Sequence, residues 1–144
     1  MARILVADDD PTIRELLQCA FELEGYVVHT VNDGTAVLAA LEEQPDPCIL
    51  LLDVNMPVLD GLDLCAELSR QPLEVAMRTY VIIVTGERVW QWQCPPIVRA
   101  VFHKPFDLEA LFALVARAAD ELESTNRGSS AMTRVAEPTY LASA

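Results

Sequence analysis

Five polar side chains in this sequence are of types that could do chemistry, and each lies within two residues of the end of a short apolar run. They are Asp8, Asp9, Asp53, Thr85 and Lys104. Short runs rich in Val, Ile and Leu are typical of parallel strands that are buried on both faces of a sheet. Ligands of an open parallel sheet bind beyond the carboxyl ends of its strands. If these strands lie side by side, three carboxylates, a hydroxyl and an ammonium group converge on one crevice.

Such a group of carboxylates requires a cation. Carboxylates a few ångströms apart repel one another, so that one of them takes up a proton or the group binds a metal ion. Mg²⁺ prefers oxygen ligands, keeps several waters and typically uses one or two carboxylates together with a phosphate oxygen. With the ion present, a carboxylate can attack phosphorus while the ammonium and the hydroxyl bind the phosphoryl oxygens. The cluster therefore predicts a Mg²⁺ site suited to phosphoryl transfer.

The elements that must position these side chains alternate along the chain, as in an α/β fold with helices packed over a parallel sheet. Five strands are predicted, at residues 3–7, 26–31, 48–52, 80–84 and 100–102. Helices are predicted from Pro11 to about Gly25, from residue 34 to about 43, from residue 60 to about 70, and from Asp107 to about 123. Asp10 and Asp107 are the expected N-caps of the first and last of these helices.

The segment between the fourth and fifth predicted strands, residues 87–99, differs from an ordinary crossover helix. Pro95 and Pro96 must interrupt a helix there after roughly two turns, so the fourth helix is predicted to be short or irregular. The segment also contains Trp90 and Trp92. Two roles are open for these rings: an exposed anchor for a protein interface, because tryptophan is enriched at hot spots, or packing of one ring on the core.

Four sequence blocks occur in order along the chain: ILVADDDPTIRELL, ILLLDVNMPVLDGLDL, YVIIVTGE and HKPFDLEAL. Together they resemble the successive blocks of response regulator receiver domains of two-component systems, over residues 3 to about 122. The resemblance implies a flavodoxin-like fold similar to that of chemotaxis regulators. This fold is a doubly wound, five-stranded parallel sheet of order 2-1-3-4-5 with helices on both faces. It also implies a signalling domain that receives a phosphoryl group from a histidine kinase or a histidine phosphotransfer protein.

The resemblance assigns the metal-binding half of the site. Asp53 is the phosphoacceptor, and Asp8 and Asp9 hold Mg²⁺ together with it. The backbone carbonyl of Asn55 completes the protein ligands. By implication, the domain catalyses only its own phosphorylation and dephosphorylation and is not an enzyme acting on a separate substrate.

The resemblance also assigns the phosphoryl-binding half. Thr85 binds a phosphoryl oxygen, Lys104 forms an ion pair with the phosphoryl group, and the peptide bond between Lys104 and Pro105 is cis. Receivers normally couple the threonine to an aromatic side chain three residues before the lysine, and here that position is Val101. Phe102 follows one residue later, where the alternation of a strand points it to the opposite face. How this chain would switch is therefore left open.

Phosphoaspartate is an acyl phosphate, and its lifetime depends on whether water can attack in line. The family places the residues two after the acceptor and two after the threonine beside that path, and here these are Asn55 and Glu87. Both are polar and could orient the attacking water. We therefore expect self-dephosphorylation that is fairly fast for a receiver.

Length and composition narrow the class of protein. The 144 residues, 52% of them hydrophobic, suffice for one domain with its own core. We expect this domain at residues 1–123, followed by a polar tail or linker stub at residues 124–144. The net charge of −12 argues against direct nucleic-acid binding. Apolar runs are too short to span a bilayer and no signal peptide is evident, so a cytoplasmic protein without membrane contact is expected.

Two other functions stay open at this point. A haloacid-dehalogenase-type phosphatase would use Asp8 and Asp10, because residues 8–12 fit its Asp-x-Asp-x-Thr pattern, but it leaves Asp53 without a role. A pseudo-receiver would keep the scaffold as a binding module without the chemistry. For the output of a receiver, we expect a homodimer or an effector protein that contacts the region from Glu87 to Phe102.

Overall fold

The structure is a computed structural model and describes residues 2–89, 94–127 and 139–141. The strands are β1 (Arg3–Ala7), β2 (Val28–Val31), β3 (Cys48–Leu52), β4 (Thr79–Thr85), β5 (Val98–His103) and β6 (Thr139–Leu141). The helices are α1 (Pro11–Leu23), α2 (Gly34–Glu43), α3 (Gly61–Ser69), α4 (Leu73–Met77) and α5 (Leu108–Arg127). Within the described residues, none of these helices is both long enough and apolar enough to cross a bilayer.

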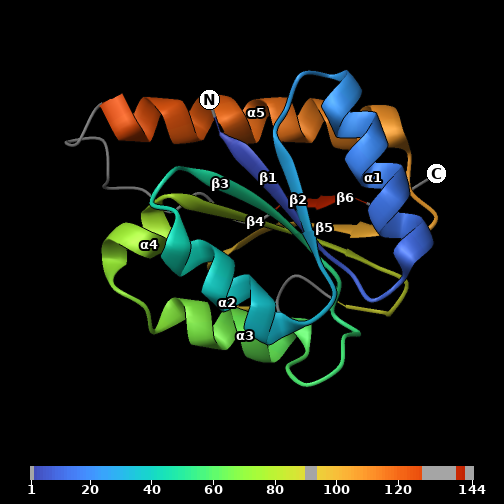
Figure 1. Cartoon of the computed structure of the whole chain (residues 1–144), viewed down its shortest axis with the longest axis horizontal. Coiled ribbons are helices and arrows are strands. Elements are labelled where there is room, and N and C mark those ends of the chain that lie inside the picture. The colour runs from blue at the N-terminus through green and yellow to red at the C-terminus, as the bar shows by residue number, and fades with distance from the viewer. Residues whose placement is uncertain (1, 90–93, 128–138, 142–144) are drawn as a thin grey trace.

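The strands form one parallel sheet of order β2-β1-β3-β4-β5-β6 (Figure 1). α1 and α5 lie over one face of this sheet, and α2 and α3 lie over the other. Side chains of β1 alternate between the two layers: Ile4 and Val6 pack with α1 and α5, whereas Leu5 and Ala7 pack with α2 and α3. This confirms the predicted doubly wound fold and its strand order 2-1-3-4-5.

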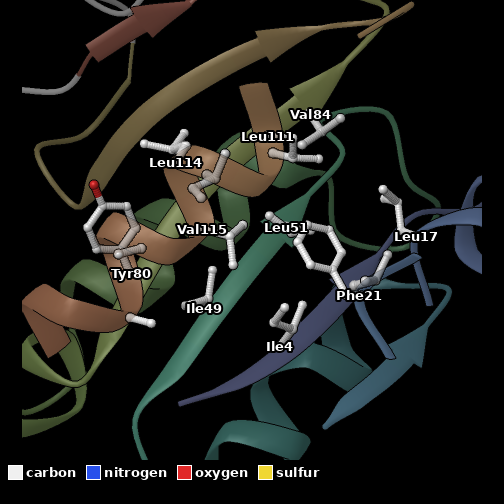
Figure 2. Close-up of a cluster of buried hydrophobic side chains, with 14 of the residues drawn as sticks. Ile4, Leu17, Phe21, Ile49, Leu51, Tyr80, Val84, Leu111, Leu114 and Val115 are labelled. Carbon is white, nitrogen blue, oxygen red and sulfur yellow. The ribbon is translucent and has the colours of Figure 1, made fainter. Parts of the chain in front are cut away.

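The larger core lies between the sheet and the pair α1 and α5. Figure 2 shows Ile4, Ile49 and Leu51 of the sheet together with Phe21 of α1 and Val115 of α5. Each of these five side chains is at most 1% exposed. Burying large aliphatic and aromatic side chains is the main favourable contribution to folding, at about 1.5–3 kcal/mol each. The core therefore holds β1 and β3 in register, and with them the residues that follow each strand.

The segment between β4 and β5 is irregular, as predicted: its described part, residues 86–89 and 94–97, forms turns and bends without a helix. Pro95 and Pro96 favour this irregular course, because a proline cannot donate the backbone hydrogen bond that a helix interior needs. The short helix α4 lies before β4 instead and was not predicted. Trp90 and Trp92 lie outside the described residues.

Regular structure continues beyond residue 123. α5 ends at Arg127, and β6 pairs in parallel with β5, with Val101 opposite Tyr140. Neither the longer helix nor this sixth strand was predicted from the polar composition of residues 124–144. Among the described residues the sheet thus has the five predicted strands and one more at the β5 edge.

Candidate functional site

Parallel pairing brings the carboxyl ends of β1, β3, β4 and β5 to the same edge of the sheet, because these strands are neighbours. Backbone hydrogen bonds extend the ladder one residue past the strands. The N–H of Asp53 donates to the carbonyl of Ala7 (2.9 Å), and the N–H of Lys104 donates to the carbonyl of Thr85 (2.8 Å). The residues that follow the strands are therefore fixed relative to one another by the sheet itself.

Lys104 joins two of the acidic side chains. Its Nζ lies 2.6 Å from Asp8 Oδ2 and 3.2 Å from Asp53 Oδ2. Each carboxylate also accepts one backbone hydrogen bond through its other oxygen, Asp8 from the N–H of Asp10 (2.9 Å) and Asp53 from the N–H of Asn55 (3.1 Å). Asp8 is 2% exposed and Asp53 is 6% exposed. Both carboxylates are thus buried and held in defined orientations around one ammonium group.

The single ammonium group of Lys104 does not fully compensate the negative charge of the carboxylates around it. Burial raises the pKa of Asp8, and the nearby charge of Asp53 raises it too, although the hydrogen bond from Lys104 acts in the opposite direction. For Lys104, burial alone would lower the pKa, but the hydrogen bond to Asp8 and the charge of Asp53 outweigh it, so the pKa is raised. The lysine therefore stays charged at neutral pH, while the ionised form of Asp8 is disfavoured without a further cation.

A metal ion of the predicted kind fits these residues. Carboxylate oxygens of Asp8, Asp9 and Asp53 lie within 4.8 Å of one another, and Asp9 is exposed whereas the other two are buried. All six residues of the predicted site line one cleft of about 220 Å³, together with Asp10, Gly86 and Glu87. Oxygen donors of this kind suit Mg²⁺, which binds through few carboxylates and keeps its remaining positions for water or phosphate oxygens.

Thr85 completes the wall of the cleft at the end of β4. The residue is 0% exposed, and its Oγ1 accepts a hydrogen bond from the N–H of Glu87 (3.1 Å). Because the oxygen acts here as an acceptor, its hydroxyl proton is available to an acceptor in the cleft. The predicted cis peptide between Lys104 and Pro105 is confirmed.

One cation of the site was missed in the sequence. Arg14, in the second turn of α1, donates from Nη1 to the backbone carbonyl of Asp8 (2.7 Å) and so fixes the turn that carries the acidic pair. In the sequence, the only indication of this role for Arg14 is that a basic residue closely follows the run Asp8–Asp10. Asp10 itself caps α1 by accepting the N–H of Thr12 (2.9 Å), as predicted.

A close backbone contact was missed as well. A β-carbon placed on Gly61 would lie 2.5 Å from the carbonyl oxygen of Asp53 and 2.7 Å from Cα of Val54. α3 can therefore begin against the backbone of Asp53 only because its first residue has no side chain. In the sequence, the pair Asp60-Gly61 indicated only where a helix begins.

Comparison with known proteins decides the family. A family model described as "Response regulator receiver domain" matches residues 4–116. This chain belongs to the response regulator receiver family. As a receiver it is a signalling domain rather than a metabolic enzyme, and response regulators interact with histidine kinases and with effectors.

The curated relatives of this receiver are longer proteins. Regulatory protein AtoC of Escherichia coli is 34% identical over 121 residues, which cover 81% of this chain and 25% of AtoC. The alkaline phosphatase synthesis transcriptional regulatory protein PhoP of Bacillus subtilis is 44% identical over 72 residues, which cover 49% of this chain and 29% of PhoP. The receiver thus spans about a quarter of the length of these relatives.

Solved receivers share both the fold and part of the sequence. The chemotaxis response regulator CheY4 of Vibrio cholerae is 26% identical with a TM-score of 0.71, and the match covers 82% of this chain and 98% of CheY4. The response regulator TrrA of Thermotoga maritima, solved in complex with Mg²⁺-BeF, is 27% identical with a TM-score of 0.68, and the match covers 82% of this chain and 99% of TrrA.

The resemblance implies an aromatic side chain at residue 101 of β5, where this chain has valine. Val101 is fully buried in the layer of α2 and α3, whereas Phe102 is buried in the layer of α1 and α5. The two side chains thus lie on opposite faces of the sheet, as the alternation of the strand predicted. Phe102 consequently cannot take the place of an aromatic side chain at residue 101.

Proposed function

We propose that this receiver accepts a phosphoryl group on Asp53 in a Mg²⁺-dependent reaction. A histidine kinase or a histidine phosphotransfer protein is the proposed donor. One observation carries the proposal: Nζ of Lys104 lies within hydrogen-bonding distance of both Asp8 and Asp53, in a cleft that Asp9 also lines. A half-buried lysine between two buried carboxylates, with a third carboxylate nearby, is an arrangement suited to phosphoryl transfer.

In the proposed step, a carboxylate oxygen of Asp53 attacks the phosphorus of the phosphohistidine. The new O–P bond forms as the P–N bond breaks, and the imidazole leaves with the electron pair. Lys104 and Thr85 are placed to bind the phosphoryl oxygens from two sides of the cleft. Asp8, Asp9, Asp53 and the carbonyl of Asn55 would hold Mg²⁺, which supplies positive charge for the same oxygens.

The proposal extends to the lifetime and the output of the phosphorylated form. Asn55 and Glu87 line the cleft beside Asp53 and could orient an attacking water. Phosphorylation is proposed to change self-association or binding of an effector protein through the region from Glu87 to Phe102. The net charge of −12 supports a protein partner over nucleic acid, and a cytoplasmic location is proposed with it.

The alternative functions receive less support. A haloacid-dehalogenase-type phosphatase would need the carboxylate of Asp10 for proton transfer, yet this carboxylate caps α1 through the N–H of Thr12. A pseudo-receiver would have no need of the ion pairs that Lys104 makes with Asp8 and Asp53. The family match favours the receiver over the phosphatase.

Beryllofluoride, which mimics a phosphoryl group, tests the proposal directly. We expect saturable binding by the native protein only with Mg²⁺ present, and loss of this binding in Asp53→Ala. Asp46→Ala is the matched control, because Asp46 is an exposed aspartate that precedes β3 at the opposite end of the strand from Asp53. Binding to Asp53→Ala with native affinity, or binding without Mg²⁺, would contradict the proposal.

A further inference from the structure

Residues 54–60 form the loop between β3 and α3 that carries Asn55. Hydrogen bonds within this loop and to the strand end give it a defined shape. The N–H of Leu59 donates to the carbonyl of Pro57 (2.8 Å), and the N–H of Asn55 donates to Oδ1 of Asp53 (3.1 Å). The shape of the loop therefore sets where the backbone carbonyl of Asn55 lies relative to the phosphoacceptor.

Val58 in this loop has a strained backbone. Its φ is 71°, in the left-handed region that β-branched residues avoid. Its side chain is 83% exposed, so burial offsets little of the strain. A residue keeps such a conformation only where the surrounding structure imposes it. Contacts from outside the loop therefore act together with its own hydrogen bonds to hold it in this shape.

The first residue of α2 makes such a contact. Asp33 caps α2 by accepting the N–H of Ala36 (2.9 Å), and the helix then begins with Gly34 directly against Leu59. A β-carbon on Gly34 would lie 2.5 Å from the carbonyl oxygen of Leu59 and 2.9 Å from its Cβ. Any side chain at residue 34 would push Leu59 away, and Leu59 directly follows the strained Val58.

We propose that Gly34 is a positioning residue for the Mg²⁺ site. By allowing α2 to begin in contact with Leu59, it holds the loop of residues 54–60, and with it the carbonyl of Asn55, in the arrangement that binds the ion. The inference rests on the proposed function, because that function requires Mg²⁺. Gly34 itself does not line the cleft and acts only through the loop.

Substitution of Gly34 by alanine tests the proposal. We expect the dissociation constant for Mg²⁺, measured by isothermal titration calorimetry, to rise roughly tenfold or more in Gly34→Ala, as with other residues that orient metal ligands. Gly25→Ala is the matched control. Gly25 has φ 95° with nothing within 4 Å of an added β-carbon, and it lies at the opposite end of α1 from the acidic run. Strain should destabilise this control without changing its Mg²⁺ affinity.

A second substitution separates positioning from a general loss of stability. Val58→Gly frees the backbone at residue 58, so the loop can absorb a displaced Leu59 without moving Asn55. We therefore expect Val58→Gly to restore most of the Mg²⁺ affinity lost in Gly34→Ala. If Gly34→Ala does not fold, Leu59→Gly removes the Cβ and Cγ that face residue 34, so it loosens the same contact from the other side and should weaken Mg²⁺ binding to a smaller extent.

Backbone amide resonances of the metal-free protein keep this inference distinct from the proposed function. We expect the amides of residues 54–60 to shift in Gly34→Ala and to stay in place in Gly25→Ala. If the native protein binds no Mg²⁺, the proposed function fails, while shifted amides still support the contact. Native Mg²⁺ affinity and unshifted amides in Gly34→Ala would overturn the inference.

Discussion

Lys104 supplies the positive charge for two buried carboxylates, and its removal should leave them uncompensated. In Mg²⁺-free buffer at pH 7.5 we expect Lys104→Met to lower the free energy of unfolding by about 2 kcal/mol. Because the hydrogen bond from Lys104 lowers the pKa of Asp8, its loss should raise that pKa further. Urea denaturation at pH 7.5 and at pH 5 measures both effects.

The sign of the pH dependence follows from the raised pKa of Asp8. A group with a folded-state pKa above its unfolded value of about 3.9 stabilises the fold fully below that value, and this contribution is lost as the pH rises through the folded-state pKa. At pH 5 more of Asp8 is protonated in Lys104→Met, so its charge is no longer left uncompensated. The difference in the free energy of unfolding between Lys104→Met and the native protein should therefore be smaller at pH 5 than at pH 7.5. Arg70→Met, which breaks an exposed ion pair with Glu67, should change stability by less than about 0.5 kcal/mol. If Lys104→Met lowered the free energy of unfolding equally at pH 7.5 and pH 5, this would contradict a role for the raised pKa of Asp8.

Glu87 lines the cleft, and in the proposed function it orients the attacking water. We expect Glu87→Ala to lengthen the half-life of the phosphorylated protein by roughly tenfold, because proton transfer and water orientation by a side chain contribute at least this much. Decay of radiolabelled phosphoprotein provides the measurement. Glu109→Ala, an exposed change on α5, should leave the half-life unchanged. A native half-life of many hours would speak against a role for Glu87.

Among individual residues, the sequence predicted the side chains of the site but not the backbone contacts that position them. Asp53 and Lys104 could be predicted because each follows an apolar strand, and the structure places both in one cleft. Gly34 and Gly61 could not, since their role depends on a neighbouring backbone that approaches across the fold. The strained φ of Val58 had no sequence signal at all, because glycine or asparagine would be the residue expected there.

Helix α5 is held to the sheet by its apolar stripe, and a single substitution can test how firmly. Leu111 is fully buried, whereas Leu23 at the end of α1 is 82% exposed. We expect Leu111→Ala to lower the free energy of unfolding by about 3 kcal/mol, because it removes buried methyl groups and leaves a cavity. Leu23→Ala, the same chemical change on the surface, should cost less than about 0.5 kcal/mol.

Denaturant titration of the two variants gives the comparison, and the slope of the titration should be unchanged in both. Equal losses would show that α5 does not pack on the sheet as described.

Elements that end at a clear polar residue were predicted with their bounds, whereas α5 continues past residue 123 to Arg127 and α4 was not predicted. The bounds of β1 and β3 are those predicted, because a polar residue follows each apolar run. α4 was not predicted because it has only five residues and begins after Pro72, which provides no side-chain cap. β6 forms by pairing with β5, which is tertiary context that the composition of residues 124–144 does not contain.

For the whole molecule, Mg²⁺ should act as a stabilising ligand, because the acidic cluster exists only in the folded state. At a concentration 100 times the dissociation constant, we expect Mg²⁺ to add about 2.7 kcal/mol to the free energy of unfolding. Asp8→Asn should lose most of this gain, and Asp46→Asn should keep it. Thermal denaturation with and without Mg²⁺ measures this stabilisation. If Mg²⁺ stabilised Asp8→Asn as much as the native protein, the ion would have to bind at another site.

The overall fold was predictable because several independent signals agreed. Continuous apolar strands indicated a sheet covered on both faces, and the resemblance of four sequence blocks to receiver domains implied the strand order. The sequence was less informative for residues 87–99. The prolines there oppose a helix, and the role of the two tryptophans could not be decided. Position 101 shows the same limit, because a valine there fills the core well but does not reveal how the molecule changes state.

Lys104 is the only lysine in the sequence. Apart from the α-amino group, all amine chemistry on this protein is therefore confined to the residue that pairs with Asp8 and Asp53. An acylating reagent would label Lys104 in the cleft and no other side-chain amine. Its rate of reaction should fall when the cleft is filled, which makes acylation a direct reporter of occupancy.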